Sequence, residues 1–240
     1  MEEVFALKVR IKFTKTGAMK FVGHLDTMRY FQKAVRRAEL PAAFSSGYSP
    51  HMIMFFAAPL GVGTTSLGEY FDIELTEPIS SAEAIRRMNA TMVEGMEVVS
   101  FVEIPDEKKS TGMAIVEAAD YLSKPIKGVL PDNWEEMLAN FFAESEIIVR
   151  KKTKKSEQEV NIRPMIYQLE VRNNEIFMQV ATGSRENLKP STVLEAFLHY
   201  LGLDEDSVNF AHHRLEVYAA LEENERRRFV PLDALGHDIE

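Results

Sequence analysis

The spacing of apolar and polar residues changes several times along the first part of the chain and predicts alternating strands and helices. In residues 4–13 apolar residues alternate with basic ones, the period of a strand with one face in water. In residues 24–39 apolar residues recur every three or four positions, which predicts a helix that ends before Pro41. The same reasoning predicts strands at 52–60 and 66–75, a helix at 81–93 capped by Ser80 or Ser81, and a strand at 96–104.

The resulting order, βαββαβ, is that of the ferredoxin-like fold, in which two helices cover one face of an antiparallel sheet. The pattern recurs after the charged stretch near residue 108, with a hairpin turning at Asn173 and Asn174. We therefore predict an α+β protein with two ferredoxin-like halves in tandem, the second carrying extra strands. The predicted parts are 1–107, 108–219 and a flexible, charged tail at 220–240.

Composition narrows the possible functions. The 240 residues contain no cysteine, which excludes disulfides, thiolate zinc sites and an iron–sulfur cluster held by cysteines of this chain. No apolar run approaches the length of a membrane span, and the start lacks a signal-peptide pattern, so we expect a cytoplasmic protein that does not contact a membrane.

The net charge is −9, but basic residues gather in two places. Residues 1–40 hold nine Lys and Arg against four Asp and Glu, and residues 150–163 hold six against two. An acidic protein with basic islands does not coat nucleic acid, but it can hold phosphates locally. The candidate phosphate or RNA contacts are Lys8, Arg10, Lys12, Arg29, Lys33, Arg36, Arg37, Lys151, Lys152, Lys154 and Lys155. One expectation is that the strand residues Lys8, Arg10 and Lys12 combine with Arg36 and Arg37 of the helix into a single patch for phosphates. The alternative is that these are ordinary solvated charges on a strand, a helix and a turn.

The stretch FSSGYSPH, residues 44–51, offers more than turn chemistry. Gly47 and Pro50 suit a turn, whereas Tyr48 can stack on a base and His51 can hold or transfer a proton. His24, at the start of the first predicted helix, is a third candidate for acid–base chemistry or anion binding. For both histidines a structural role, as a cap or a partly buried side chain, is the alternative. We predict no metal site, because Glu69 and Asp72 fall on opposite faces of one strand.

Taken together, several segments resemble a radical SAM-associated family of unknown function, whose members are fused to or encoded beside cobalamin-binding-type radical SAM proteins. The similarity lies in KTG, HLD with Arg29, RRAELP, SSGYSPH, PLGVG and GEYFDIEL, and continues through Asn89, Gly95, Tyr121, TKK, NIRP and LKP. Val22 and Gly23 depart from the family pattern where a serine is common, as does Lys189 where arginine is common.

This resemblance implies an accessory protein whose radical SAM partner carries the iron–sulfur cluster and S-adenosylmethionine, with no cofactor on this chain. Family members are often encoded near an RNA-processing ribonuclease, so the resemblance also favours RNA modification or maturation as the context. The expected function is RNA binding without catalysis.

Two other functions remain open. Paired ferredoxin-like halves are also similar to the CRISPR repeat-processing endoribonucleases, which use no metal, and His24, His51 and Tyr48 would then be the catalytic candidates. Alternatively, the chain is a protein-interaction module that does not contact RNA.

Overall fold

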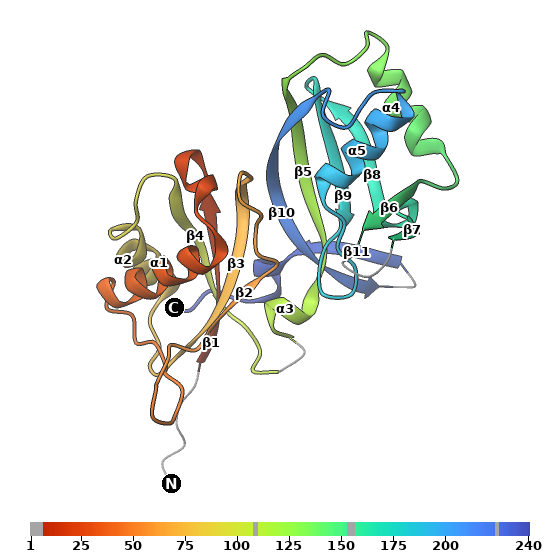
Figure 1. The fold of residues 1–240 in the computed structure, drawn as a ribbon. Coiled ribbons are helices and arrows are strands. Elements are labelled where there is room, and N and C mark those ends of the chain that lie inside the picture. Colours follow the sequence, from red (N-terminus) through yellow and green to blue (C-terminus); the bar gives the residue numbers. More distant parts are fainter. Residues whose placement is uncertain (1–6, 108–109, 153–156, 224–225) are drawn as a thin grey trace. The chain divides into compact units, whose positions relative to one another are not determined.

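The computed structural model describes residues 7–107, 110–152, 157–223 and 226–240 (Figure 1). The chain is α+β, as predicted, with antiparallel strands, and it divides into two compact units. The second unit is Ala118–Leu215, and the first comprises the chain up to Glu117 and again from Glu216 onwards. The expected parts 1–107 and 108–219 therefore differ from these units, because the C-terminal segment returns to the first one. None of the helices in the described segments has both the length and the apolar composition needed to cross a membrane.

The first unit contains the predicted βαββαβ order. Its strands are adjacent in the order β4-β1-β3, with β2 also paired to β3. The elements are β1 (Leu7–Lys15), η1 (Gly17–Phe21), α1 (His24–Arg37), β2 (Met54–Ala57), β3 (Thr65–Leu75), α2 (Ser81–Asn89), β4 (Met96–Glu103) and α3 (Gly112–Ile115), followed after the second unit by β11 (Arg226–Pro231) and η4 (Leu232–Leu235).

The helices α1 and α2 cover one face of this sheet, and the core lies between them. On β1, Val9, Ile11 and Phe13 point to this face and are fully buried. Phe31 of α1 lies 4.4 Å from the ring of Phe13, within a cluster of phenylalanines that also includes residues of β2 and β3. Burial of such large apolar side chains supplies most of the stabilisation of a unit of this size.

The opposite face of the sheet holds charged residues that are not in water. Arg10 has no exposed surface, and Asp72, its neighbour across the β1–β3 pair, accepts hydrogen bonds from Nε at 2.8 Å and from Nη2 at 3.1 Å. Arg10 also donates to the main-chain oxygens of Leu232 at 3.1 Å and Ser110 at 2.7 Å, and the main-chain N–H of Gly112 donates to Asp72 at 2.7 Å. The prediction of a wet face on β1 is wrong, because later segments cover it.

The two neighbouring lysines of β1 also have carboxylate partners. Lys8 Nζ lies 2.5 Å from Asp106, and Lys12 forms an ion pair with Glu216. The hydroxyl of Tyr70 lies within hydrogen-bonding distance of Glu216, at 2.7 Å, and of Asp233, at 2.9 Å. Burial, reinforced by these two carboxylates, raises the pKa of Tyr70, so the hydroxyl keeps its proton and acts as a donor.

The C-terminal residues are part of this arrangement. Instead of the flexible tail expected at 220–240, β11 pairs with the end of β10, and η4 follows directly. Leu232 is fully buried and supplies the carbonyl that binds Arg10. The first unit is therefore completed only by the end of the chain.

In the second unit the strands are adjacent in the order β10-β5-β9-β8, and β6 and β7 form a separate two-stranded sheet. The turn between β8 and β9 is at Asn173 and Asn174, as predicted, and both residues have positive φ. The elements are β5 (Val116–Lys127), α4 (Trp134–Ala143), β6 (Ile148–Lys152), β7 (Glu157–Asn161), η3 (Arg163–Met165), β8 (Ile166–Arg172), β9 (Glu175–Ala181), α5 (Pro190–Tyr200) and β10 (Asn209–Glu223), which runs on into the first unit.

The buried ion pair predicts a large effect of one substitution. Asp72→Ala should lower the free energy of unfolding by about 3–5 kcal/mol, because it leaves the buried Arg10 without its counter-charge. The matched control is Asp26→Ala, which removes an exposed carboxylate paired with Arg29 and should cost at most about 1 kcal/mol. Urea unfolding followed by circular dichroism measures both, and similar midpoints for the two variants would contradict the prediction.

Candidate nucleic-acid interface

Helix α1 presents a row of cations to the outside. One side of α1 is buried against the sheet through Phe31, Ala34 and Val35. The opposite side of the helix therefore faces outward. The exposed cations, at helical spacing on that side, are Arg29, Lys33, Arg36 and Arg37. Arg29 contacts Asp26 at 3.3 Å, whereas the other three form no ion pair with any residue that the structure describes. These three charges are available to an anion.

The segment after α1 folds back on itself and carries the FSSGYSPH stretch at its tip. The main-chain N–H of Ser45 donates to the oxygen of His51 at 2.9 Å, and that of Ile53 donates to Ala43 at 3.0 Å. Between them, Gly47 has a φ of 108°, which a residue with a side chain rarely adopts. The tip is thus a narrow loop held by its own main chain, and Tyr48 at its end is fully exposed.

His51 is fixed by a neighbour within the same loop. Its Nδ1 lies 2.8 Å from the hydroxyl oxygen of Ser45, which also accepts a hydrogen bond from the His51 main-chain N–H at 3.1 Å. The residue is exposed, and Nε2 has no hydrogen-bond partner among the described residues. The imidazole therefore has one ring nitrogen held and the other open to a ligand.

A cation–π contact joins the helix to the loop. The guanidinium carbon of Arg36 lies 5.8 Å from the centre of the Phe44 ring, and Phe44 is 45% exposed. Cations that can meet phosphates and aromatic rings that can stack on bases therefore belong to one surface. We call it the α1–tip surface; its members are Arg29, Lys33, Arg36, Arg37, Phe44, Tyr48 and His51.

Phe44 was not among the residues singled out from the sequence. The signal was present, because an apolar residue directly before a polar, glycine-containing turn lies where side chains are usually exposed. Its role became visible only when the fold brought it beside Arg36.

The third candidate for acid–base chemistry, His24, packs against an aromatic ring. His24 begins α1, is half-buried and has its ring edge-on to Phe56 at 5.5 Å between centres. No hydrogen bond or ring contact joins it to His51 in the described part of the chain. The contact with Phe56 gives His24 a packing role.

The strand cations do not extend the α1–tip surface. Lys8, Arg10 and Lys12 point away from Val9 and Ile11, and hence to the face of the sheet that α1 does not cover. We expected one patch combining these three with Arg36 and Arg37; the alternation of side chains along β1 instead places the two groups on opposite faces. Arg10 has no accessible surface for an RNA contact.

The lysine-rich turn remains a prediction. Lys151 and Lys152 end β6, but their side chains lie outside the described residues, as do Lys154 and Lys155 entirely. Within the described segments no group of three or more histidine, aspartate or glutamate residues is arranged to hold a metal ion.

Comparison with known proteins gives a family and two distant likenesses of fold. No curated protein matches the chain. A chain of a Cbf5-Nop10-Gar1 complex is 10% identical with a TM-score of 0.44, over 87% of this chain and 48% of that one, so this chain spans about half its length. An unknown protein from Galdieria sulphuraria is 10% identical with a TM-score of 0.28, over 88% of this chain and 99% of that one.

Neither likeness is close enough to carry an argument about function. The family match is of a different kind, because it covers most of the chain and includes both the α1–tip surface and the β6–β7 hairpin. The chain belongs to the family described as an uncharacterized protein conserved in bacteria (DUF2344), whose model matches residues 8–190.

Proposed function

We propose that this protein binds single-stranded RNA through the α1–tip surface and acts as an accessory protein to a radical SAM enzyme. The observation that carries the RNA proposal is the contact between Arg36 and Phe44, which makes one surface out of a row of cations and an exposed aromatic loop. Cations beside aromatic rings are the combination that single-stranded nucleic-acid sites use.

Each part of the surface has a distinct physical task. The arginines can donate two parallel hydrogen bonds to a phosphate, while Lys33 adds a positive charge without fixed geometry. Tyr48 and Phe44 can stack only on bases that are not already paired, which favours a single strand over a duplex. His51 Nε2 can hydrogen-bond a base edge or a ribose hydroxyl.

The overall charge of −9 limits where RNA can bind. Most of the surface repels a polyanion, so binding is confined to places where cations lack carboxylate partners. On β1, Lys8, Arg10 and Lys12 have such partners, whereas Lys33, Arg36 and Arg37 have none among the described residues. Local binding of this kind suits a protein that presents RNA to another enzyme.

The radical SAM partner is supported by the sequence resemblance, and the absence of cysteine agrees with it. An iron–sulfur cluster of such an enzyme needs cysteine thiolates, and this chain has none to offer. The cluster and S-adenosylmethionine would then be bound by the partner, and this chain would contribute RNA binding.

The charge contribution is tested by a double substitution with a matched control. Arg36→Glu with Arg37→Glu should weaken binding of a fluorescein-labelled RNA of about 12 nucleotides at least ~10-fold, because two phosphate contacts become repulsive. The slope of log K against log salt should become less steep by about 1.4 for two lost contacts with a single strand. Fluorescence anisotropy across a salt series measures both quantities.

The control changes another pair of adjacent arginines in the first unit. Arg86 and Arg87 of α2 already have a counter-charge in Glu83, so Arg86→Glu with Arg87→Glu changes the net charge equally without touching the α1–tip surface. If both double variants weaken binding to the same extent, the effect is one of net charge and the site assignment is wrong.

Stacking is tested separately at the loop tip. Tyr48→Ala should weaken RNA binding by about 1–3 kcal/mol and leave the unfolding midpoint unchanged, because the side chain is fully exposed. Tyr48→Phe is the control, since it keeps the ring and should bind like the wild type. Equal binding by all three proteins would exclude stacking at this position, and new RNA ends in the same samples would favour the endoribonuclease instead.

The partner is tested by co-expression with a radical SAM protein encoded beside this chain. We expect the two proteins to purify together and to stay together after ribonuclease treatment. Dissociation on treatment would indicate that RNA alone bridges them, and failure to purify together at all would contradict the accessory role.

A further inference from the structure

The short hairpin formed by β6 and β7 has an unpaired edge. Within the described segments β6 pairs with β7 alone, in a sheet of two strands. The main-chain oxygen of Ile147 accepts a hydrogen bond from the main-chain N–H of Ile162 at 2.8 Å. Ile147 and Ile162 are therefore a hydrogen-bonded pair of the antiparallel ladder. Since main-chain groups alternate between the two edges of a strand, those of Ile148 and Arg150 point away from β7. They have no hydrogen-bond partner among the described residues.

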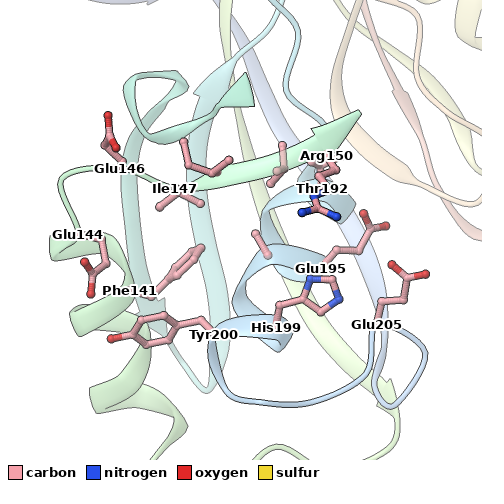
Figure 2. A pocket seen from close by; sticks show the side chains of 13 residues that line it. Phe141, Glu144, Glu146, Ile147, Arg150, Thr192, Glu195, His199, Tyr200 and Glu205 are labelled. Carbon is pink, nitrogen blue, oxygen red and sulfur yellow. The ribbon is translucent and has the colours of Figure 1, made fainter. Parts of the chain in front are cut away.

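This free edge borders a groove of about 1080 Å³ within the second unit (Figure 2). Four consecutive residues line it, Ile147 and the first three residues of β6, as expected when the edge of the strand faces the space. The opposite wall is α5, where Thr192, Glu195 and His199 form one side of the helix. The groove therefore runs between a strand edge and a helix.

One end of the groove holds two aromatic rings, with Glu144 and Glu146 beside them. Phe141 and Tyr200 lie there with ring centres 5.5 Å apart, and Figure 2 shows both toward the Ile147 end of β6. Ile148 is 50% exposed beside the space. These side chains offer a contact surface for one apolar side chain of a ligand.

The other end is acidic, although Arg150 and His199 also line it. Glu195 and Glu205 line it toward the Arg150 end, and neither forms an ion pair with a described residue. Burial and the charge of Glu205 raise the pKa of Glu195, and His199 and Lys189 offset only part of this shift. Arg150 itself pairs with Glu159 of β7 at 3.4 Å. A cationic ligand would remove the repulsion.

We propose that this groove binds an extended segment of a partner protein, which adds as a strand to the free edge of β6 and places an apolar side chain by Phe141 and Tyr200 and a lysine or arginine by Glu195 and Glu205. Strand addition satisfies the unpaired main-chain groups, and pockets at alternate positions give specificity. The volume slightly exceeds the usual range for small-molecule pockets, about 300–1,000 Å³, and suits a short peptide better.

Four glutamates line the groove, two at each end, together with one arginine that already pairs with Glu159. A partner segment that carries a cation therefore suits the groove better than an acidic one.

The test uses the full chain and two labelled peptides, Thr-Leu-Thr-Lys-Thr and the reverse order Thr-Lys-Thr-Leu-Thr, because the direction of the added strand is not specified. Their leucine and lysine are two residues apart and so share one face of a strand. We expect one of them to bind and to slow hydrogen exchange at the amides of Ile148 and Arg150, with Val149 unchanged. The same peptide with glutamate in place of lysine should bind at least about 10-fold more weakly.

Two variants separate strand addition from contact with the side chains. Ile148→Pro removes an outward N–H while leaving the bonds to β7, so it should abolish binding, whereas Ile148→Ala should only weaken it. Glu195→Gln with Glu205→Gln should remove the preference for lysine over glutamate and keep the amide protection. This double variant keeps the proposal testable if Ile148→Pro does not fold.

Three outcomes would overturn the proposal. These are absence of binding by both lysine peptides at millimolar concentration, equal binding of the lysine and glutamate forms, and binding without protection at Ile148 and Arg150. Protection of those amides that grows with protein concentration, together with a dimer in sedimentation, would replace the partner protein by a second copy.

Discussion

The first unit depends on the buried pair between Arg10 and Asp72. A charged guanidinium without access to water is tolerated only when its donors are occupied, and here a carboxylate and two main-chain oxygens take that role. The pair connects four parts of the chain, because its partners come from β1, β3, the segment around Ser110 and η4. The polar side of the sheet can be covered only if all of these segments are in place.

This constraint also determines which cations can meet a ligand. Three cations of β1, Lys8, Arg10 and Lys12, balance carboxylates of the same unit, so their presence is no evidence of RNA binding. The cations of α1 lie over the apolar side of the sheet and face outward, because Phe31 and Val35 anchor the helix from below. Two groups of basic residues that are close in sequence thus have separate roles, one in stability and one in the α1–tip surface.

Much of the fold could be predicted, because it follows from local patterns. The periodicity around Phe31 identified α1, Ser80 caps α2 by accepting a hydrogen bond from the N–H of Glu83, and the Asn173–Asn174 pair identified a hairpin. The buried role of Arg10 could not be predicted, because an alternating pattern does not distinguish a face in water from one that meets distant carboxylates. The strand β11 was missed because its run of arginines is typical of solvated chain.

The candidate site was predictable to a smaller extent. Tyr48 and His51 stood out as an aromatic and a proton-carrying group in a turn, and both are exposed on one loop. Their connection to Arg36 through Phe44 is a tertiary contact without a sequence pattern of its own. The groove beside β6 was missed for the same reason, since a strand's free edge depends on which strands pair with it.

The return of the chain to its first unit has a consequence during synthesis. Arg10 and the carbonyl oxygen of Leu232 that it binds are 222 residues apart, and Ala118–Leu215, which lie between them, form a compact unit of their own. At translation rates of about 5–20 residues per second, roughly 10–45 seconds pass between the appearance of the two residues. The second unit can fold on the ribosome before the first is complete, and until then the arginine of the nascent first unit has to remain hydrated.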